Sequence, residues 1–164
     1  MSTGLKNSLP NPFNAKVDGD VRVAIVTAEW NGNITGALTE GCVATLRDHG
    51  VEDDMIDRFS VPGAIELTFA ASSLIETGAY DVVIVFGCVI RGGTPHFDYV
   101  CQSVTQGITQ LNADCDIPVI FGVLTVDCEQ DAIDRAGGRL GNKGSEAAEA
   151  ALKMHAFVQQ VKDI

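Results

Sequence analysis

The chain has 164 residues, of which 46% are hydrophobic and 20% are charged, and its net charge is −11 at neutral pH. This length fits one domain with a substantial core, and the composition argues against wholesale disorder. The acidic balance argues against a general basic surface for nucleic acid or for an anionic membrane. We also expect neither a secretory signal nor a membrane span, because no apolar run approaches the length of a bilayer.

The cysteines are odd in number and form neither a CxxC pair nor a cluster with histidine at metal-ligand spacing; they are Cys42, Cys88, Cys101, Cys115 and Cys128. This pattern predicts reduced thiols in a cytoplasmic protein, without disulfides and without a bound metal. Cys88 ends an apolar strand and could line a pocket. The other four are expected to be small core residues.

Residues 1–19 contain two prolines, several Asn and Ser residues and no hydrophobic periodicity. They are predicted to be an N-terminal arm outside the core, which leaves residues 20–164 as the domain.

From residue 21 onward the pattern alternates between strands and helices. Strands are predicted at 21–30, 55–61, 81–90 and 118–125, and helices at 35–48, 64–77, 97–111, 127–136 and 145–161. Such alternation predicts an α/β three-layer sandwich, a flavodoxin-like, mostly parallel four-stranded sheet with helices on both faces. In sheets of this kind ligands bind beyond the carboxyl ends of the strands.

The third strand runs into an unusual turn, "VIRGGTPHFDYV", at residues 89–100. Thr94 fits the N-cap of the next helix and Pro95 its first position. Free backbone N–H groups and the helix dipole make an anion site there. His96 lies in the first turn, where the dipole favours a neutral imidazole that can take and return protons. The alternative is that His96 simply packs against a neighbour.

Basic residues are scarce in the middle of the chain. Between Phe59 and Gly144 they are Arg91, Arg135, Arg139 and Lys143. The last three lie close together, so an anionic substrate is expected at this cluster. Arg135 can grip a phosphate through its planar fork, or it can be a helix-surface arginine paired with Asp131 or Asp134.

Five motifs occur in order from about residue 20 to the C-terminus: "AEWN", "VPGAIEL", "VIRGGTPHFDYV", "FGVLTVD" and "DRAGGRLGNKG". Together they resemble the lumazine synthase family. The resemblance implies a transferase that condenses 5-amino-6-(D-ribitylamino)uracil with 3,4-dihydroxy-2-butanone 4-phosphate. The product is 6,7-dimethyl-8-ribityllumazine, phosphate and water are released, and no metal or organic cofactor takes part. This is the penultimate step of riboflavin biosynthesis.

The resemblance also implies roles for individual residues. His96 would move protons, while Arg135, Gly93 and Thr94 would hold the phosphate. Trp30 would stack on the pyrimidine, although many members of the family have Phe there. The other implied substrate-binding positions are Asn31 and Glu66 at the ribityl chain, Ala64, Ile65, Cys88, Val89, Ile90 and Phe121 around the heterocycle, and Lys143 at the ribityl group or phosphate. Arg91 lies within the motif, with no role assigned to its side chain.

The family further implies a homo-pentamer with active sites shared between neighbours, in which the segment 15–19 would add a strand to the adjacent sheet. The compact "AGGRLGNKG" suggests an icosahedral shell of pentamers, and riboflavin synthase is a further expected partner. Two alternatives remain at this stage. One is a flavin-binding, flavodoxin-like module and the other a shell-forming homologue, both without condensing activity. Turnover of the two substrates, compared with tight flavin binding, separates them.

Overall fold

The computed structural model describes residues 20–164. The predicted arm, including the strand-forming segment 15–19, therefore lies outside the described residues. The main elements are β1 (Val23–Ala28), α1 (Gly32–Asp48), β2 (Ile56–Val61), α2 (Glu66–Glu76), β3 (Val82–Ile90), α3 (His96–Asp114), β4 (Val119–Val126), α4 (Glu129–Arg135) and α5 (Lys143–Lys162). Every predicted strand and helix is present, with ends shifted by a few residues. A 3-10 turn (Asp53–Met55) and a small hairpin of β5 (Ala136–Gly138) and β6 (Gly141–Asn142) were not predicted.

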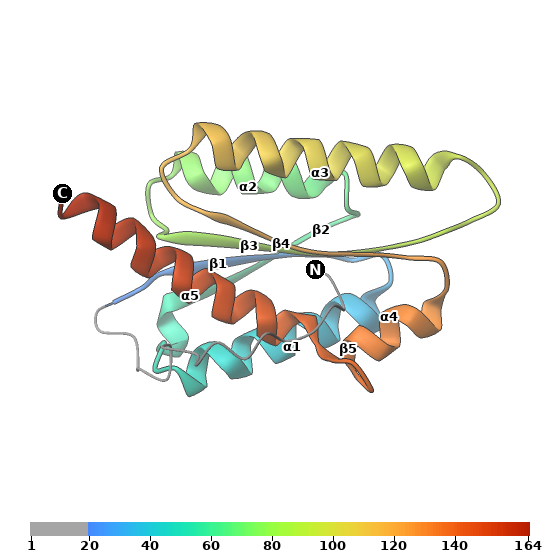
Figure 1. Ribbon diagram of the computed structural model, residues 1–164, viewed down its shortest axis with the longest axis horizontal. Helices are drawn as coiled ribbons and strands as arrows, with labels where there is room; N and C mark the ends of the chain where they lie inside the picture. Colours follow the sequence, from blue (N-terminus) through green and yellow to red (C-terminus); the bar gives the residue numbers. More distant parts are fainter. Residues whose placement is uncertain (1–19) are drawn as a thin grey trace.

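The four long strands form one sheet in the order β2-β1-β3-β4, and all three pairings are parallel. Helices α2 and α3 cover one face, and α1, α4 and α5 cover the other (Figure 1). The predicted three-layer α/β sandwich is thus confirmed. Because the strands are parallel, their carboxyl ends meet at one edge of the sheet, which is where ligands bind in such folds.

Two apolar cores lie on opposite faces of the sheet. Successive side chains of β1 point to opposite faces: Val23 and Ile25 belong to the core under α1 and α5, whereas Ala24 and Val26 belong to the core under α2 and α3. Strand β3 is buried on both faces from residue 82 to 88, as its continuous apolar run predicts. Within residues 20–164, no helix is both long and apolar enough to cross a membrane.

A close approach between α1 and α5 fixes the start of α5. A Cβ atom on Gly144 would overlap the carbonyl oxygen of Leu38, so no larger residue fits there. Asn142 caps α5 by accepting a hydrogen bond from the Gly144 N–H at 2.8 Å, and its side-chain amide donates to the Ala37 carbonyl at 3.0 Å. These contacts fix the start of α5, and with it Lys143, against α1.

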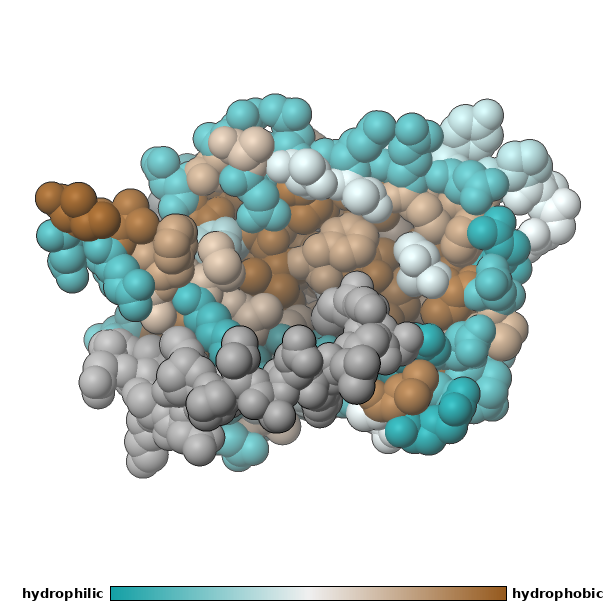
Figure 2. Space-filling model, in the orientation of Figure 1, coloured by the Kyte–Doolittle hydropathy of each residue, from teal (hydrophilic) through white to brown (hydrophobic). Residues whose placement is uncertain are grey.

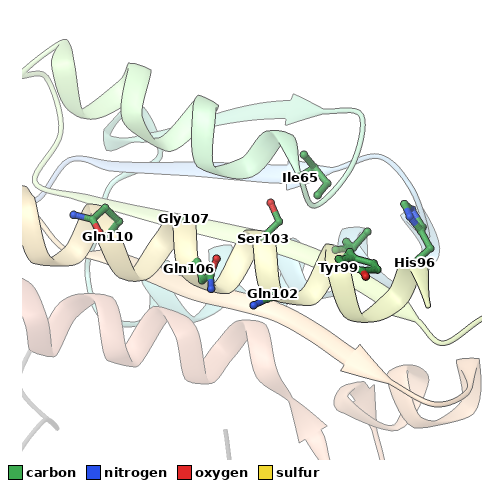
Figure 3. Close-up of a pocket in the computed structure, with 9 residues that line it drawn as sticks. Ile65, His96, Tyr99, Gln102, Ser103, Gln106, Gly107 and Gln110 are labelled. Carbon is green, nitrogen blue, oxygen red and sulfur yellow. The ribbon is translucent and has the colours of Figure 1, made fainter.

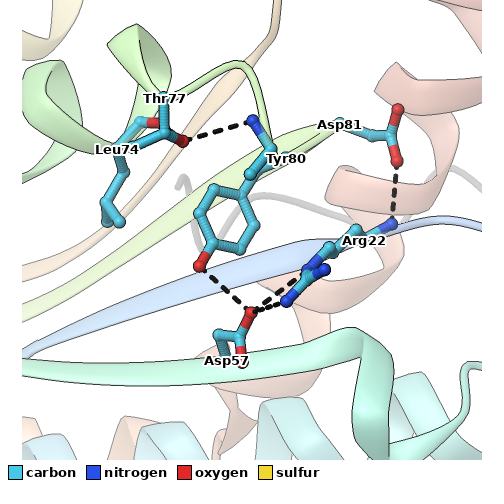
Figure 4. A network of polar contacts seen from close by, with 7 residues as sticks. Arg22, Asp57, Leu74, Thr77, Tyr80 and Asp81 are labelled. Atoms are coloured by element: carbon cyan, nitrogen blue, oxygen red, sulfur yellow. Dashed lines mark hydrogen bonds and ion pairs between the residues drawn. The ribbon is translucent and has the colours of Figure 1, made fainter.

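A polar network ties the amino ends of the strands together (Figure 4). Arg22, just before β1, donates two hydrogen bonds to Asp57 Oδ2 on β2, at 2.9 and 3.2 Å, and its backbone N–H donates to Asp81 at 2.8 Å. The Tyr80 hydroxyl donates to the same Asp57 oxygen at 3.0 Å. The hydrogen bond from Arg22, supported by that from Tyr80, holds the pKa of Asp57 below its ordinary value.

A carboxyl with a lowered folded-state pKa stabilises the fold above its unfolded pKa of about 3.9, and that contribution disappears as the pH falls through the folded pKa. Asp57→Asn should therefore lower the free energy of unfolding near pH 6 by about 0.5–1 kcal/mol, a small value because the pair is partly exposed. Tyr80→Phe should show a smaller loss of the same sign. Urea titrations at pH 6 and pH 3 measure the difference, and a loss that stayed constant down to pH 3 would contradict this assignment.

Candidate active site

A cavity of about 360 Å³ opens at the carboxyl ends of β1 and β3. Nine of the predicted site residues line it: Trp30, Asn31, Ala64, Ile65, Glu66, Cys88, Val89, Ile90 and His96. Ala28 and Val100 also line it and were not predicted. Both lie within the quoted motifs, at the start of "AEWN" and at the end of "VIRGGTPHFDYV", but as buried apolar residues they could not be told from core residues by composition. The structure thus brings together residues from three of the motifs, with Cys88 beside one of them, at the edge that the fold predicts.

Trp30 is a surface residue on the rim of this cavity, with 67% of its area exposed, so it belongs to neither core. Its ring lies against Gly63, where an added Cβ would be 2.6 Å from the indole Cε3. The Trp30 backbone N–H also donates to the Pro62 carbonyl at 3.2 Å. Gly63 is therefore needed so that the turn before α2 can approach the indole closely.

Asn31 adopts a left-handed backbone conformation, with φ of 58°, at the start of α1. Its side-chain amide donates to the Cys88 carbonyl on β3 at 2.8 Å, which ties the ends of the two strands together. The amide nitrogen is the end that faces a carbonyl, so Oδ1 remains available as an acceptor for a ligand hydroxyl or N–H.

The half-buried Glu66 side chain has one oxygen, Oε2, that is shielded from solvent and makes no hydrogen bond within residues 20–164. Leaving a buried carboxylate oxygen unpaired is costly, so such groups are rare in native proteins unless a partner arrives. Although Glu66 lies in the first turn of α2, this oxygen is not solvated. Glu66 is therefore suited to accept hydrogen bonds from polar groups of a ligand in the cavity.

Cys88 lines the cavity, as predicted, and burial raises the pKa of its thiol to about 11, with a further contribution from the charge of Glu129. The thiol is protonated near neutral pH and is part of the wall, not a nucleophile. All five cysteines are free, as expected. The prediction that the other four are core residues holds for Cys42 but is wrong for Cys128, which is exposed; Cys101 and Cys115 are half-buried.

His96 is the first residue of α3, at one end of an open groove of about 690 Å³ that follows this helix to Gln110 (Figure 3). The predicted cap is only partly correct. The helix begins at His96 with Pro95, not Thr94, at the capping position, and the His96 N–H donates to Thr94 Oγ1 over a long 3.4 Å. Gly93 and Thr94 are exposed and line neither the groove nor the cavity.

The remaining predicted residues lie in a second hollow of about 150 Å³ along β4, which Phe121, Arg135 and Lys143 help to line. Arg135 donates to the Asp131 carbonyl at 2.7 Å, and Lys143 pairs with Glu146 at 2.8 Å. Among residues 20–164, the two hollows share no lining residue. One chain therefore divides the predicted site into a part with His96 and a part with Arg135.

No group of three or more His, Cys, Asp or Glu side chains in the described chain gathers as a metal site requires. The chemistry on offer is instead an apolar, aromatic-rimmed cavity with two oxygen acceptors, an imidazole at its mouth and a separate basic hollow. These groups suit the positioning of a polar heterocycle and the movement of protons.

Comparison with known proteins identifies the family. A family model described as 6,7-dimethyl-8-ribityllumazine synthase matches residues 20–159. The chain belongs to this family. Proteins named 6,7-dimethyl-8-ribityllumazine synthase include one from Parabacteroides distasonis, 55% identical over 96% of this chain and 99% of its own length. Another, from Phocaeicola vulgatus, is 53% identical over 95% of this chain and 89% of its own. A third, from Porphyromonas gingivalis, is 58% identical over 82% of this chain and 84% of its own length. The lumazine synthase resemblance of the motifs is confirmed.

Trp30 is the single tryptophan of the chain, so its fluorescence reports on the cavity rim alone. A planar ligand stacked on the indole should quench this signal, because the exposed ring offers it a large, rigid contact face. Titration with riboflavin or with 6,7-dimethyl-8-ribityllumazine measures the effect. An unchanged Trp30 signal at saturating ligand would mean that the heterocycle binds elsewhere.

Proposed function

We propose that the chain condenses 5-amino-6-(D-ribitylamino)uracil with 3,4-dihydroxy-2-butanone 4-phosphate to give 6,7-dimethyl-8-ribityllumazine, phosphate and water, in riboflavin biosynthesis. The observation that carries the proposal is the family match over residues 20–159, together with a cavity lined by nine of the expected residues. The reaction itself follows from the family. The assignment of roles to individual side chains is our proposal.

In the proposed complex the pyrimidine stacks on Trp30, and its ribityl hydroxyls donate hydrogen bonds to Asn31 Oδ1 and to the otherwise unpaired Glu66 oxygen. The apolar walls from Ala64, Ile65 and residues 88–90 exclude water from the ring. This arrangement fixes the amine of the pyrimidine at the cavity mouth. Holding the two reactants in place is a large part of catalysis for such a condensation.

The amine would attack the ketone and one water would leave to form an imine, after which phosphate leaves and the ring closes with loss of a second water. Each of these steps moves a proton, and His96 is the titratable side chain at the mouth of the cavity that can take and return it. The exposed Gly93 and Thr94, next to His96, would receive the phosphate group of the ketone with their N–H groups.

Arg135 would neutralise the same phosphate, with Lys143 beside it and Phe121 closing the heterocycle pocket. Within one chain these three residues lie in the second hollow, along the edge strand β4. We therefore propose that they complete the cavity of a neighbouring subunit, in a ring of identical chains in which each interface pairs two different surfaces.

A homo-pentamer is the assembly that we propose. Apolar surface is visible in the middle of the face where β4 runs (Figure 2), and large apolar side chains are exposed, Ile65 and Tyr99 in the groove and Phe69 four residues after Ile65 on α2. Such exposed patches support association. The segment 15–19, predicted to add a strand to a neighbour, lies outside the described residues and stays a prediction.

Assembly of pentamers into an icosahedral shell is proposed on the short connection between α4 and α5, which holds only the β5–β6 hairpin. Association with riboflavin synthase and a cytoplasmic location stay predictions from the sequence.

Substitution of the two catalytic candidates should separate phosphate binding from proton transfer. Arg135→Ala should lower kcat/KM for the ketone phosphate by about ten- to a hundred-fold, since it removes one charge-assisted contact, and should leave pyrimidine binding nearly unchanged. His96→Ala should slow turnover by up to about 10²–10⁴-fold with both binding constants close to the parent values.

Steady-state kinetics with each substrate varied in turn, with direct titration of the pyrimidine, provide the measurement. Arg139→Ala is the matched control, because Arg139 is four residues further along and pairs with Asp134, with 71% of its side chain exposed. Equal losses for the pyrimidine and the ketone phosphate in Arg135→Ala would show that Arg135 is not a phosphate ligand.

Light scattering tests the assembly. The expected particle has about five times the 17.3 kDa mass of the chain, or a multiple of that unit. A fully active monomer would rule out the shared site, and electron micrographs that showed isolated pentamers at every pH and phosphate concentration would rule out the shell.

A further inference from the structure

Arg91 makes contacts in three directions from the end of β3. Its Nε donates to Asp127 Oδ1 at 2.8 Å, just beyond the end of β4, and its Nη1 lies 3.4 Å from Asp98 Oδ1 in the first turn of α3. The guanidinium carbon also lies 4.1 Å from the centre of the Phe97 ring, a favourable cation–π arrangement. In addition, the Arg91 backbone N–H donates to the Val126 carbonyl at 2.9 Å.

The turn that follows Arg91 has little support of its own. Gly92 and Gly93 form no hydrogen bond with any other described residue, and a Cβ at either position would meet no atom within 4 Å. Thr94 contributes only its long contact with the His96 N–H. Glycine carries the largest backbone entropy, so a turn of this kind is held in place by the groups that bracket it.

Arg91 brackets this turn, because the residue itself precedes the turn and its side chain reaches Phe97 and Asp98 beyond it. The same side chain joins the turn to Asp127, and so to the end of the neighbouring strand. Isolated exposed ion pairs contribute little to global stability. A planar guanidinium that is stacked on a ring and paired on two sides instead fixes an orientation.

We propose that Arg91 is a positioning residue, which holds the turn 92–95 and the first turn of α3 in the geometry that receives the phosphate group of the substrate. The inference rests on the proposed phosphate role of Gly93 and Thr94. It assigns Arg91 no contact with the substrate, because its guanidinium is already engaged by Asp127, Asp98 and Phe97. Arg91 acts through the backbone N–H groups that it keeps in place.

The test compares Arg91→Met, Arg91→Lys and Asp127→Ala with the parent enzyme. The measured quantities are the KM for the ketone phosphate, the inhibition constant of inorganic phosphate, kcat and the dissociation constant of the pyrimidine. Arg47→Met is the matched control: Arg47 is a similarly exposed arginine at the end of α1, paired with the exposed Asp53. Thermal unfolding of every variant accompanies the kinetics.

Arg91→Met should raise the KM for the ketone phosphate and the inhibition constant of phosphate by about 5- to 20-fold, as expected for misplaced binding groups, and leave the pyrimidine constant within about twofold. Arg91→Lys should fall between Met and the parent, because lysine keeps the charge but lacks the planar fork. Asp127→Ala should weaken phosphate binding as well, since it removes the hydrogen bond that joins Arg91 to the end of β4.

Tighter phosphate binding in Asp127→Ala would overturn the proposal, because a guanidinium that binds phosphate once it is freed from Asp127 would make Arg91 a direct ligand. An Arg91→Met variant that matched the Arg47→Met control, or that weakened the pyrimidine as much as the phosphate, would overturn it as well. A parent enzyme that bound phosphate without any turnover would instead contradict the proposed function, and the phosphate constants would still test Arg91.

Discussion

The parallel pairing of β1, β3 and β4 is the constraint on which the site depends, because it places the ends of these strands at one edge of the sheet. Two side chains then join those ends directly. Asn31 donates to the carbonyl of Cys88, and Arg91 bridges from β3 to Asp127 after β4. The cavity is the space that remains between the ends of β1 and β3 and the first turns of α2 and α3. A ligand there meets groups that the backbone has already placed.

The separation of Arg135 and Lys143 from the cavity is the reason to propose that the active site is shared between subunits. Arg135 and Lys143 have partners within their own chain, in Asp131 and Glu146, so both cations are held in place before any phosphate arrives. In the proposed ring these cations meet the imidazole and the glycine turn of the next subunit. In this proposal catalysis requires association, so turnover depends on the oligomeric state. The acidic net charge of the chain opposes association, and the shared site is what makes association necessary.

Much of this architecture follows from sequence patterns, and the exceptions have physical causes. The strands and helices were predictable because their apolar periodicity extends over many residues, whereas β5 and β6 are too short to show any period. The cavity residues followed from the lumazine synthase motifs. Contacts between distant segments could not be predicted from the sequence: the Asn31 amide reaches Cys88, 57 positions away, and Arg91 reaches Asp127, 36 positions away. The exposure of Cys128 was missed because a thiol carries no local signal of burial.

The central claim is that one active site takes His96 from one subunit and Arg135 from its neighbour. Co-expression of His96→Ala and Arg135→Ala chains with different affinity tags, followed by purification of the mixed oligomers, tests it directly. If the site is shared, random mixing in equal amounts restores about one quarter of the sites, those that combine the two intact residues. If both residues serve the same chain's site, mixed oligomers show no more activity than the average of the two variants, and the account is contradicted.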